Sequence, residues 1–369
     1  MNKFSNYSVL ILRTERTHDD LELVVSELKI RGIQVFIFNV QLVAEGGLSF
    51  TDFINSYIWE EIDIIDVRYC RGIARNWLST YKRIFDELQD FLQIQETRGN
   101  VITVTPSFAT LHWVLYKAGY IKELQEQKIS MIPTMIIPPP PDGHSEFDIV
   151  DYLNQAGSEG IVLKPAVGSG ANKLEFIRKV IDSEYQYQVK SYYLDNHQEK
   201  QIVNFIKNYR ELNSHFQDYC NQINIPILVQ HFEKITSEIS MIFVGEIPHC
   251  IERTTAPNMG IAHERFGGEN ILIINPPNKW LTFAQEVYQA LPEVAKKTIS
   301  LRIDMFERLD GKLVLSEIEG ASHRTFFPEV LQFCKEHPLA EKRRIEQLDL
   351  NKIRALKKYV ELLCSFKLS

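Results

Sequence analysis

Residues 301–306 read LRIDMF and residues 313–319 read LVLSEIE, with a polar turn containing Asp310-Gly311 between them. Two apolar runs joined by such a turn predict a β-hairpin. Side chains alternate between the two faces of a strand, so charged residues two positions apart share a face. This hairpin therefore predicts where the charged groups of the chain gather.

Four charged side chains fall on matching positions of the two strands. Arg302 and Asp304 share one face, Glu317 and Glu319 share another, and these faces can coincide. Three carboxylates and one guanidinium within apolar strands are costly unless a bound group neutralises them, and Mg²⁺ carrying a polyphosphate does so. The alternative is a half-exposed hairpin with a solvated charged face.

A second segment far upstream reads GIVLKPAVGSGAN, at residues 160–172. A buried strand delivers Lys164 and a loop of small residues follows, in which glycines allow backbone N–H groups to approach an anion closely. The loop does not match a Walker A motif, and Lys173 stands where the last glycine of a dinucleotide fingerprint belongs. By itself the segment fits a surface hairpin equally well.

The composition is that of an ordinary globular protein. The 369 residues suffice for two or three subdomains, and the 44% apolar and 24% charged shares are typical values. The net charge of −7 argues against wholesale nucleic-acid binding. No apolar run approaches the roughly 20 residues that span a bilayer, and the first residues lack a signal-peptide core. The five cysteines are scattered, which favours reduced thiols and a cytoplasmic location.

The front of the chain shows the pattern of an α/β domain. Strands are expected at 8–12 and 33–38 with a helix at 19–31 between them, and further strands at 62–69 and 101–104. A strand, a helix and a strand in succession indicate a parallel sheet.

Three later segments carry expectations of their own. The run Pro138–Gly143 is expected to be a stiff connector, with an SH3-like recognition motif as the alternative. Residues 181–225, rich in Tyr, Gln and Asn, are expected to form a helical insertion. Residues 340–366 are expected to form an amphipathic helix, which is either solvated or packed on a second subunit in a homodimer.

Taken together in this order, the motifs resemble those of the ATP-grasp ligases. The chain is most similar to the group that contains the O-ureido-serine cyclo-ligase of cycloserine biosynthesis. The matching landmarks lie, in order, at 64–68, 111–117, 132–134, 162–165, 228–233, 237–243, 245–253 and 302–319.

This resemblance implies a fold and its domains. The fold class is α/β, α+β in the grasp part, with a Rossmann-like pre-ATP-grasp domain at 1–115. A central subdomain follows at 116–228, and a C-terminal subdomain at 229–369 completes the clasp on ATP.

The resemblance also implies the activity. Such ligases join a small-molecule carboxylate to an amine through an acyl phosphate, and they release ADP and phosphate. No nucleic acid or membrane is involved. Asp304, Glu317 and Glu319 match the ligands of one or two Mg²⁺ ions, with Mn²⁺ as an alternative. The common form of the second pair is Glu-x-Asn, and the Glu-x-Glu here fits the cyclo-ligase group but leaves the role of Glu319 less defined.

The nucleotide contacts implied by the resemblance fall into three sets. Lys117 and Lys164 match the lysines on the α- and β-phosphates, and Gly168, Ser169 and Gly170 match a flap over the phosphates. Gln230, His231 and Phe232 match the hinge whose backbone pairs with adenine. Glu233 or Glu238 matches the residue that binds the ribose, and Glu238 is favoured for a position near the nucleotide.

Further residues match the chemical end of the site. Arg253 and Arg302 match cations beside the γ-phosphate or the substrate carboxylate. The segment 254–270 matches a loop that closes over the acyl phosphate, and its His263 is a weak candidate for a base. His323 and Arg324 replace the Ile-Glu-Pro usual in the cyclo-ligase group, which leaves the acceptor open.

Three other functions remain compatible with the sequence. A maturase forming bonds within a peptide needs a peptide groove, which residues 181–225 offer. A non-catalytic ATP-binding protein is disfavoured, because the carboxylates, lysines and arginines are all retained. A phosphotransferase that stops at the phosphorylated product uses the same scaffold, and a requirement for an amine distinguishes the ligases from it.

Overall fold

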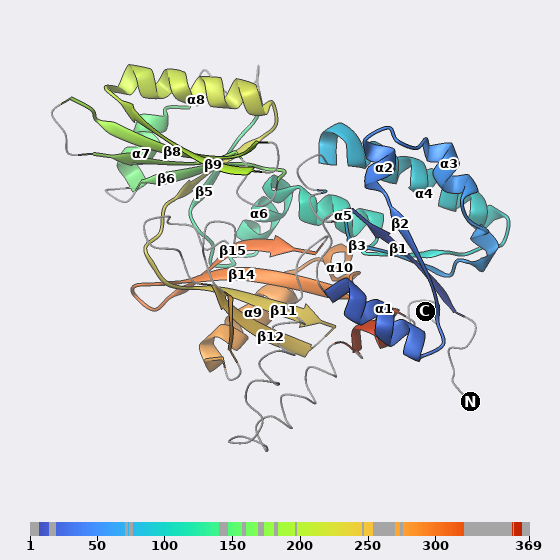
Figure 1. The fold of residues 1–369 in the computed structure, drawn as a ribbon. Coiled ribbons are helices and arrows are strands. Elements are labelled where there is room, and N and C mark those ends of the chain that lie inside the picture. Colours follow the sequence, from blue (N-terminus) through green and yellow to red (C-terminus); the bar gives the residue numbers. More distant parts are fainter. Residues whose placement is uncertain are drawn as a thin grey trace.

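A computed structural model shows three β-sheets with helices packed against them (Figure 1). The structure describes residues 7–14, 20–70, 73, 77–139, 147–156, 160–168, 173–180, 184–195, 198–245, 247–253, 270–273, 276–320, 356 and 358–363.

The front of the chain forms a parallel four-stranded sheet of order β2-β1-β3-β4. Helix α1 covers one face, where Val24 and Leu28 pack against Val9 and Ile11 of β1. The predicted parallel α/β arrangement is therefore confirmed. Its elements are β1 (Ser8–Arg13), α1 (Asp20–Ile30), β2 (Gln34–Asn39), α2 (Gln41–Ala44), α3 (Phe50–Asn55), a 3-10 turn (Trp59–Glu61), β3 (Ile64–Tyr69), a π-helical turn (Trp77–Tyr81), α4 (Lys82–Thr97) and β4 (Thr103–Thr105).

The middle of the chain forms an antiparallel six-stranded sheet of order β5-β10-β6-β7-β8-β9. Helices α7 and α8 cover one face of it, and the opposite face looks toward the third sheet (Figure 1). Its elements and the two helices that lead into it are α5 (Phe108–Leu115), α6 (Lys117–Glu126), β5 (Thr134–Ile137), α7 (Ile149–Ala156), β6 (Ile161–Pro165), β7 (Leu174–Lys179), β8 (Tyr187–Asp195), β9 (Gln198–Ile206), α8 (Tyr209–Ile223) and β10 (Ile227–His231).

The predicted helical insertion at 181–225 is wrong over half its length, because the strands β8 and β9 pair as a hairpin before α8 begins. The physical reason lies in the alternation along β8. Tyr187, Val189 and Ser191 share the face that packs against the helices, and Gln188, Lys190 and Tyr192 share the other, where Gln188 and Tyr192 are buried as well. This period of two is a strand signal, which the abundance of Gln and Asn obscured.

The last part of the chain forms an antiparallel five-stranded sheet of order β13-β12-β11-β14-β15. The predicted hairpin is its pair β14–β15, and Gly311 in the turn has a φ of +77°, which favours glycine. The elements are β11 (Ile235–Val244), β12 (Ile247–Arg253), β13 (Asn270–Ile273), α9 (Asn278–Ala290), α10 (Glu293–Lys296), β14 (Ser300–Arg308) and β15 (Leu313–Glu319).

A short helical piece near the C-terminus packs against the front domain. Tyr359, Val360 and Leu363 are buried in the same core as β1 and α1. The rest of the helix predicted at 340–366 lies outside the described residues, apart from Leu356 and the 358–363 stretch. Of the predicted connector Pro138–Gly143, only Pro138 and Pro139 are described, and they follow β5 directly. No helix in the described part of the chain is long and apolar enough to cross a membrane.

Candidate functional site

The five-stranded sheet has one apolar face and one charged face. On the apolar face, Ile239 and Met241 of β11 and Ile303 and Met305 of β14 lie in one core with residues of α9. Alternation places Glu238, Ser240, Arg302 and Asp304 on the other face. The packing of α9 on the apolar face thus fixes which way the charged side chains point.

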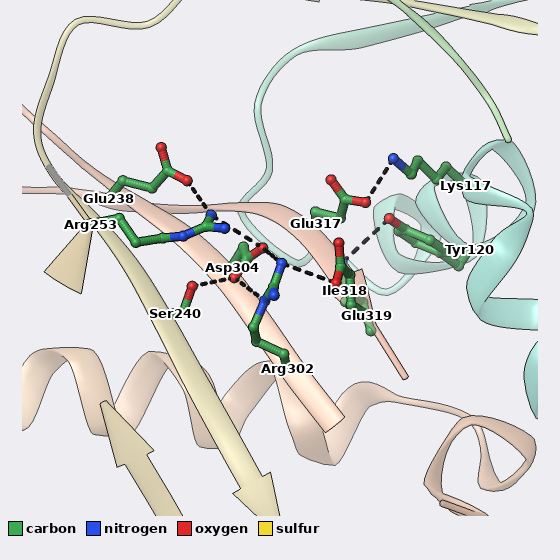
Figure 2. Close-up of polar contacts among 10 residues, drawn as sticks. All are labelled: Lys117, Tyr120, Glu238, Ser240, Arg253, Arg302, Asp304, Glu317, Ile318 and Glu319. Carbon is green, nitrogen blue, oxygen red and sulfur yellow. Dashed lines mark hydrogen bonds and ion pairs between the residues drawn. The ribbon is translucent and has the colours of Figure 1, made fainter. Parts of the chain in front are cut away.

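The strand register brings the four predicted charges of the hairpin together. Arg302 lies opposite Glu319 and Asp304 lies opposite Glu317, so all four side chains share one face as the sequence predicted (Figure 2). A register irregularity between Asp304 and Met305 follows directly. The register of the two strands therefore shifts just beyond the cluster, and the cluster residues themselves stay paired.

Asp304 is the most heavily bonded carboxylate of the site. Arg302 donates to it twice, from Nε to Oδ1 at 2.9 Å and from Nη2 to Oδ2 at 2.7 Å. The Ser240 hydroxyl donates to Oδ1 at 2.6 Å, and Arg253 Nη1 lies 3.7 Å from Oδ2. Burial alone raises the pKa of Asp304, but the two guanidiniums outweigh it and lower the pKa, so this group is a carboxylate at neutral pH.

Arg302 also reaches the second strand, with Nη2 at 3.1 Å from Glu319 Oε2. Burial raises the pKa of Glu319 in spite of this guanidinium, because Glu317 and Asp304 are close and carry the same charge. Arg302 therefore bridges two of the three predicted metal carboxylates.

Two lysines from elsewhere in the chain face Glu317. Lys117, the first residue of α6, is buried and places Nζ 2.7 Å from Glu317 Oε1 (Figure 2). Tyr120, one helical turn later, accepts the backbone N–H of Ile318 at 3.3 Å and so docks α6 on β15. Lys164 on β6 lies near the same carboxylate, and its pKa is lowered by burial to about 8, with Glu317 opposing the shift.

Glu238 and Arg253 form an ion pair across β11 and β12, where they are register partners. Arg253 Nη1 donates to Glu238 Oε1 at 2.5 Å. Burial raises the pKa of Glu238 to about 7, although Arg253 acts against it. In all, four carboxylates (Glu238, Asp304, Glu317 and Glu319) face four cations (Lys117, Lys164, Arg253 and Arg302).

The predicted adenine hinge lies at the end of β10. Gln230 Nε2 donates to Thr134 Oγ1 at 2.8 Å, and the N–H groups of His231 and Phe232 donate to the carbonyls of Pro133 and Gly160. Two of the hinge N–H groups are therefore already engaged within the sheet. The Phe232 ring meets Phe176 edge-on at 5.4 Å between centroids, which makes an aromatic corner beside the hinge.

The two candidates for the ribose contact lie in different surroundings. Glu233 Oε2 pairs with Arg308 Nε at 3.1 Å, and neither residue belongs to the charge cluster defined above. Glu238 belongs to the charge cluster through Arg253, as described above. Glu238 therefore lies beside the residues predicted to bind the phosphates and their metal, and its own nucleotide contact remains a prediction.

Several predicted residues lie outside the described part of the chain. They are Ser169, Gly170, the loop at 254–269 with His263, and His323 with Arg324. Gly168 is described and lies just past β6.

Sequence reasoning assigned no role to three residues of the site: Phe176, Ser240 and Tyr120. Ser240 lies two positions from Glu238, and Tyr120 lies three positions from Lys117, so strand alternation and helical spacing were available signals. Phe176 had no such signal, because nothing in the sequence pairs β7 with the hinge.

The donor chemistry fits a hard divalent cation, since carboxylate oxygens are the ligands that Mg²⁺ prefers. In the described residues, no three His, Cys, Asp or Glu side chains already converge as a metal cage. Arg302 holds Asp304 and Glu319, and Lys117 holds Glu317, at distances of 2.7–3.1 Å. A metal bound by these carboxylate oxygens would therefore have to displace Arg302 and Lys117 from them.

Comparison with known proteins finds similarity in structure only. No family model matches the chain, and no curated protein matches it in sequence. A crystal structure of D-cycloserine synthetase DcsG superposes with a TM-score of 0.58 at 14% identity, covering 96% of this chain and 99% of that one. The D-alanine–D-alanine ligase of Bacillus anthracis, complexed with ATP, gives 0.54 at 12%, with 95% and 99% covered.

A third structure is the RiPP-associated ATP-grasp ligase of Chryseobacterium gregarium, in complex with ADP and with a leader and core peptide. It gives a TM-score of 0.56 at 13% identity, with 98% of this chain and 97% of that chain covered. All three similarities extend over nearly the whole length of this chain, and they confirm the predicted fold.

Proposed function

We propose that this chain, which has the ATP-grasp fold, is an ATP-dependent ligase that joins a carboxylate to an amine on a small amino-acid-like substrate. One observation carries the proposal. Four carboxylates and four cations from separate elements converge on the charged face of one sheet and balance each other. Such a cluster is costly for folding and is suited to a ligand rich in charge.

The proposed reaction has two steps. The substrate carboxylate attacks the γ-phosphorus of ATP, which gives an acyl phosphate and ADP. The amine then attacks the acyl carbon and displaces inorganic phosphate, losing a proton as the amide forms. Negative charge gathers on phosphate oxygens, so fixed cations rather than a nucleophilic side chain do the work.

The chain supplies these cations from two directions. Lys117 and Lys164 face the carboxylates from α6 and β6, where they suit the α- and β-phosphates. Arg253 and Arg302 lie on the five-stranded sheet beside Asp304, where they suit the γ-phosphate or the substrate carboxylate. Arginine is apt there, because its planar fork binds two oxygens at once.

Asp304, Glu317 and Glu319 would hold Mg²⁺, which supplies charge neutralisation between the β- and γ-phosphates. Arg302 spans Asp304 and Glu319, so a metal held by these carboxylates would compete with its guanidinium, which would then be available to bind the phosphate or the substrate.

Bond formation within a peptide is the second candidate, and one observation favours it. Strand β9 is an edge strand of the six-stranded sheet, and it exposes Ile202, Val203 and Phe205 at 46%, 42% and 51%. An extended peptide adds to such an edge through backbone hydrogen bonds. ADP release that requires a peptide, and not free amino acids, would select this candidate.

Calorimetry with MgATP tests the nucleotide site directly. Glu317→Ala and Lys164→Ala should each weaken MgATP binding at least about tenfold, because each removes a charge that faces the phosphates or their metal. Glu293→Ala and Lys312→Ala are matched controls, since these side chains are 85% and 76% exposed and pair with Lys296 and Asp310 rather than with residues of the cluster. Folded wild-type protein that does not bind MgATP would overturn the proposal, and binding justifies a screen of carboxylate and amine pairs for ADP release.

A further inference from the structure

The described residues of 181–225 supply none of the charges of the cluster, and they build a buried polar network on the other side of the six-stranded sheet. Helix α8 packs there on Leu163 and Ile177, the face opposite to Lys164. At the centre of the network is Glu175, the second residue of β7, whose side chain is 1% exposed. A carboxylate this deeply buried needs several partners.

Glu175 has three partners from two elements. Ser191 and Tyr193 of β8 donate their hydroxyls to Oε1 at 2.7 and 3.2 Å. His215 of α8 places Nε2 2.8 Å from Oε2. The carboxylate is thus fully engaged, and it ties the start of β7 to α8.

The same face of α8 reaches the backbone just before β7. Tyr219, one helical turn after His215, donates its hydroxyl to the carbonyl oxygen of Lys173 at 2.6 Å. Lys173 has a φ of +59°, a left-handed conformation that costs energy in a non-glycine residue unless its surroundings hold it. Tyr219 thus hydrogen-bonds to Lys173 and His215 to Glu175, at the point where the glycine-rich segment leads into β7.

The other end of the glycine-rich segment is held by the same part of the chain. Helix α8 ends at Ile223, its C-cap Asn224 adopts a left-handed conformation, and Pro226 lies two residues after that cap. The Pro226 carbonyl accepts the N–H of Ala166 at 2.8 Å, and the Ala166 carbonyl accepts the N–H of Lys117 at 2.9 Å. Both described ends of the segment, before Gly168 and at Lys173, are thus fastened to α8 or to the residues directly after it.

We propose that His215 and Tyr219 are positioning residues for phosphate binding: with Glu175 they hold Lys173, and so set the ends of the glycine-rich segment beside Lys164. The inference rests on the proposed function, since it needs a polyphosphate on the opposite face of the sheet. Neither side chain touches that face, so both act through the backbone they hold. Fixing that backbone in advance lowers the ordering cost of binding phosphate.

The test compares a ligand with phosphates against one without. Tyr219→Phe removes only the hydroxyl that holds Lys173, and it should weaken MgATP binding about fivefold, the worth of one net hydrogen bond. Adenosine binding should stay within about twofold, since the adenine hinge is untouched. Tyr209→Phe on the same helix is the matched control, because Tyr209 is half exposed and its hydroxyl accepts a hydrogen bond from Arg210, the next residue of the helix.

His215 provides a second, independent pair of variants. His215→Leu should weaken MgATP binding by a similar factor, and His215→Gln, which keeps an N–H donor for Glu175, should restore most of it. Equal weakening of MgATP and adenosine, or no weakening at all, overturns the inference, because a purely structural role does not distinguish the two ligands. Folded wild-type protein that fails to bind MgATP overturns the proposed function instead, and the inference falls with it.

Discussion

Strands β3 and β14 each carry an aspartate and an arginine two residues apart, and their surroundings differ. On β3, Asp66 and Arg68 are 0% and 2% exposed and meet through Tyr359: Arg68 Nε donates to its hydroxyl at 3.0 Å, which donates to Asp66 Oδ2 at 2.5 Å. The guanidinium also lies over the rings of Tyr69 and Tyr359, 4.2 and 4.5 Å from their centroids. This pair is enclosed by aromatic side chains.

On β14, Arg302 and Asp304 bind each other directly and are joined by further charges from five other elements. The comparison teaches that an arginine and an aspartate on a buried strand do not by themselves mark a functional site. An enclosed pair serves the fold, whereas an accumulation of charges of both signs costs stability, which fits the ligand site proposed for it.

The largest effect is expected at the enclosed pair. Arg68→Leu removes the cation and leaves Asp66 buried, so the free energy of unfolding should fall by about 3–5 kcal/mol. Urea unfolding followed by circular dichroism measures it, and Arg31→Leu serves as a control because its partners Glu27 and Glu361 are near the surface. A loss below about 1 kcal/mol would mean that the β3 pair is no more structural than a surface ion pair.

In the charge cluster, removing a buried cation is expected to raise the free energy of unfolding rather than lower it. Burial lowers the pKa of Lys164 from 10.5 to about 8, so the folded state holds its proton less firmly than the unfolded state. Lys164→Met removes this cost and should raise the free energy of unfolding at pH 7 by about 1 kcal/mol, a value kept small because the side chain is partly exposed.

The pH dependence gives this prediction its check. The unfolded state binds more protons between pH 8 and 10.5, so wild-type stability rises over that range and the advantage of Lys164→Met disappears by its upper end. Urea midpoints at pH 7, 9 and 10.5 measure the trend. A destabilised Lys164→Met protein at pH 7 would contradict the view that the cluster costs the fold stability.

Much of the fold and half of the site were predictable for a physical reason: strand periodicity is local. The hairpin register follows from a turn and two apolar runs, which is why Arg302, Asp304, Glu317 and Glu319 were placed on one face correctly. The parallel front sheet followed in the same way from a strand, a helix and a strand.

The remainder depended on pairing between distant segments, which no local pattern encodes. Ser240 reaches Asp304 across 64 residues, and Tyr359 reaches Asp66 across 293. The hairpin of β8 and β9 is a different kind of miss, because its alternation was present in the sequence and the polar composition was given more weight. That miss also hid the network around Glu175.

A third buried ion pair, Glu175 with His215, offers the smallest effect and a test of sign. The hydrogen bond to Glu175 raises the pKa of His215 above 6.5, burial acts against it, and Asp218 on the same helix adds to it. The folded state therefore binds this proton more tightly than the unfolded state. The stabilisation is fully present below about pH 6.5 and is lost as the pH rises through the folded pKa.

The free energy of unfolding of His215→Gln should consequently lie below that of wild type by about 1 kcal/mol or less in acid, and this difference should shrink toward alkaline pH. His112 gives the contrasting case, because burial and Lys82 lower its pKa. The free energy of unfolding of His112→Gln should therefore rise relative to that of wild type as the pH falls. Urea unfolding of both variants between pH 5 and 9 measures the two slopes. If the two slopes have the same sign, Glu175 does not hold His215 as a cation. The network around Glu175 would then share its burial with the β3 pair, but not its charge.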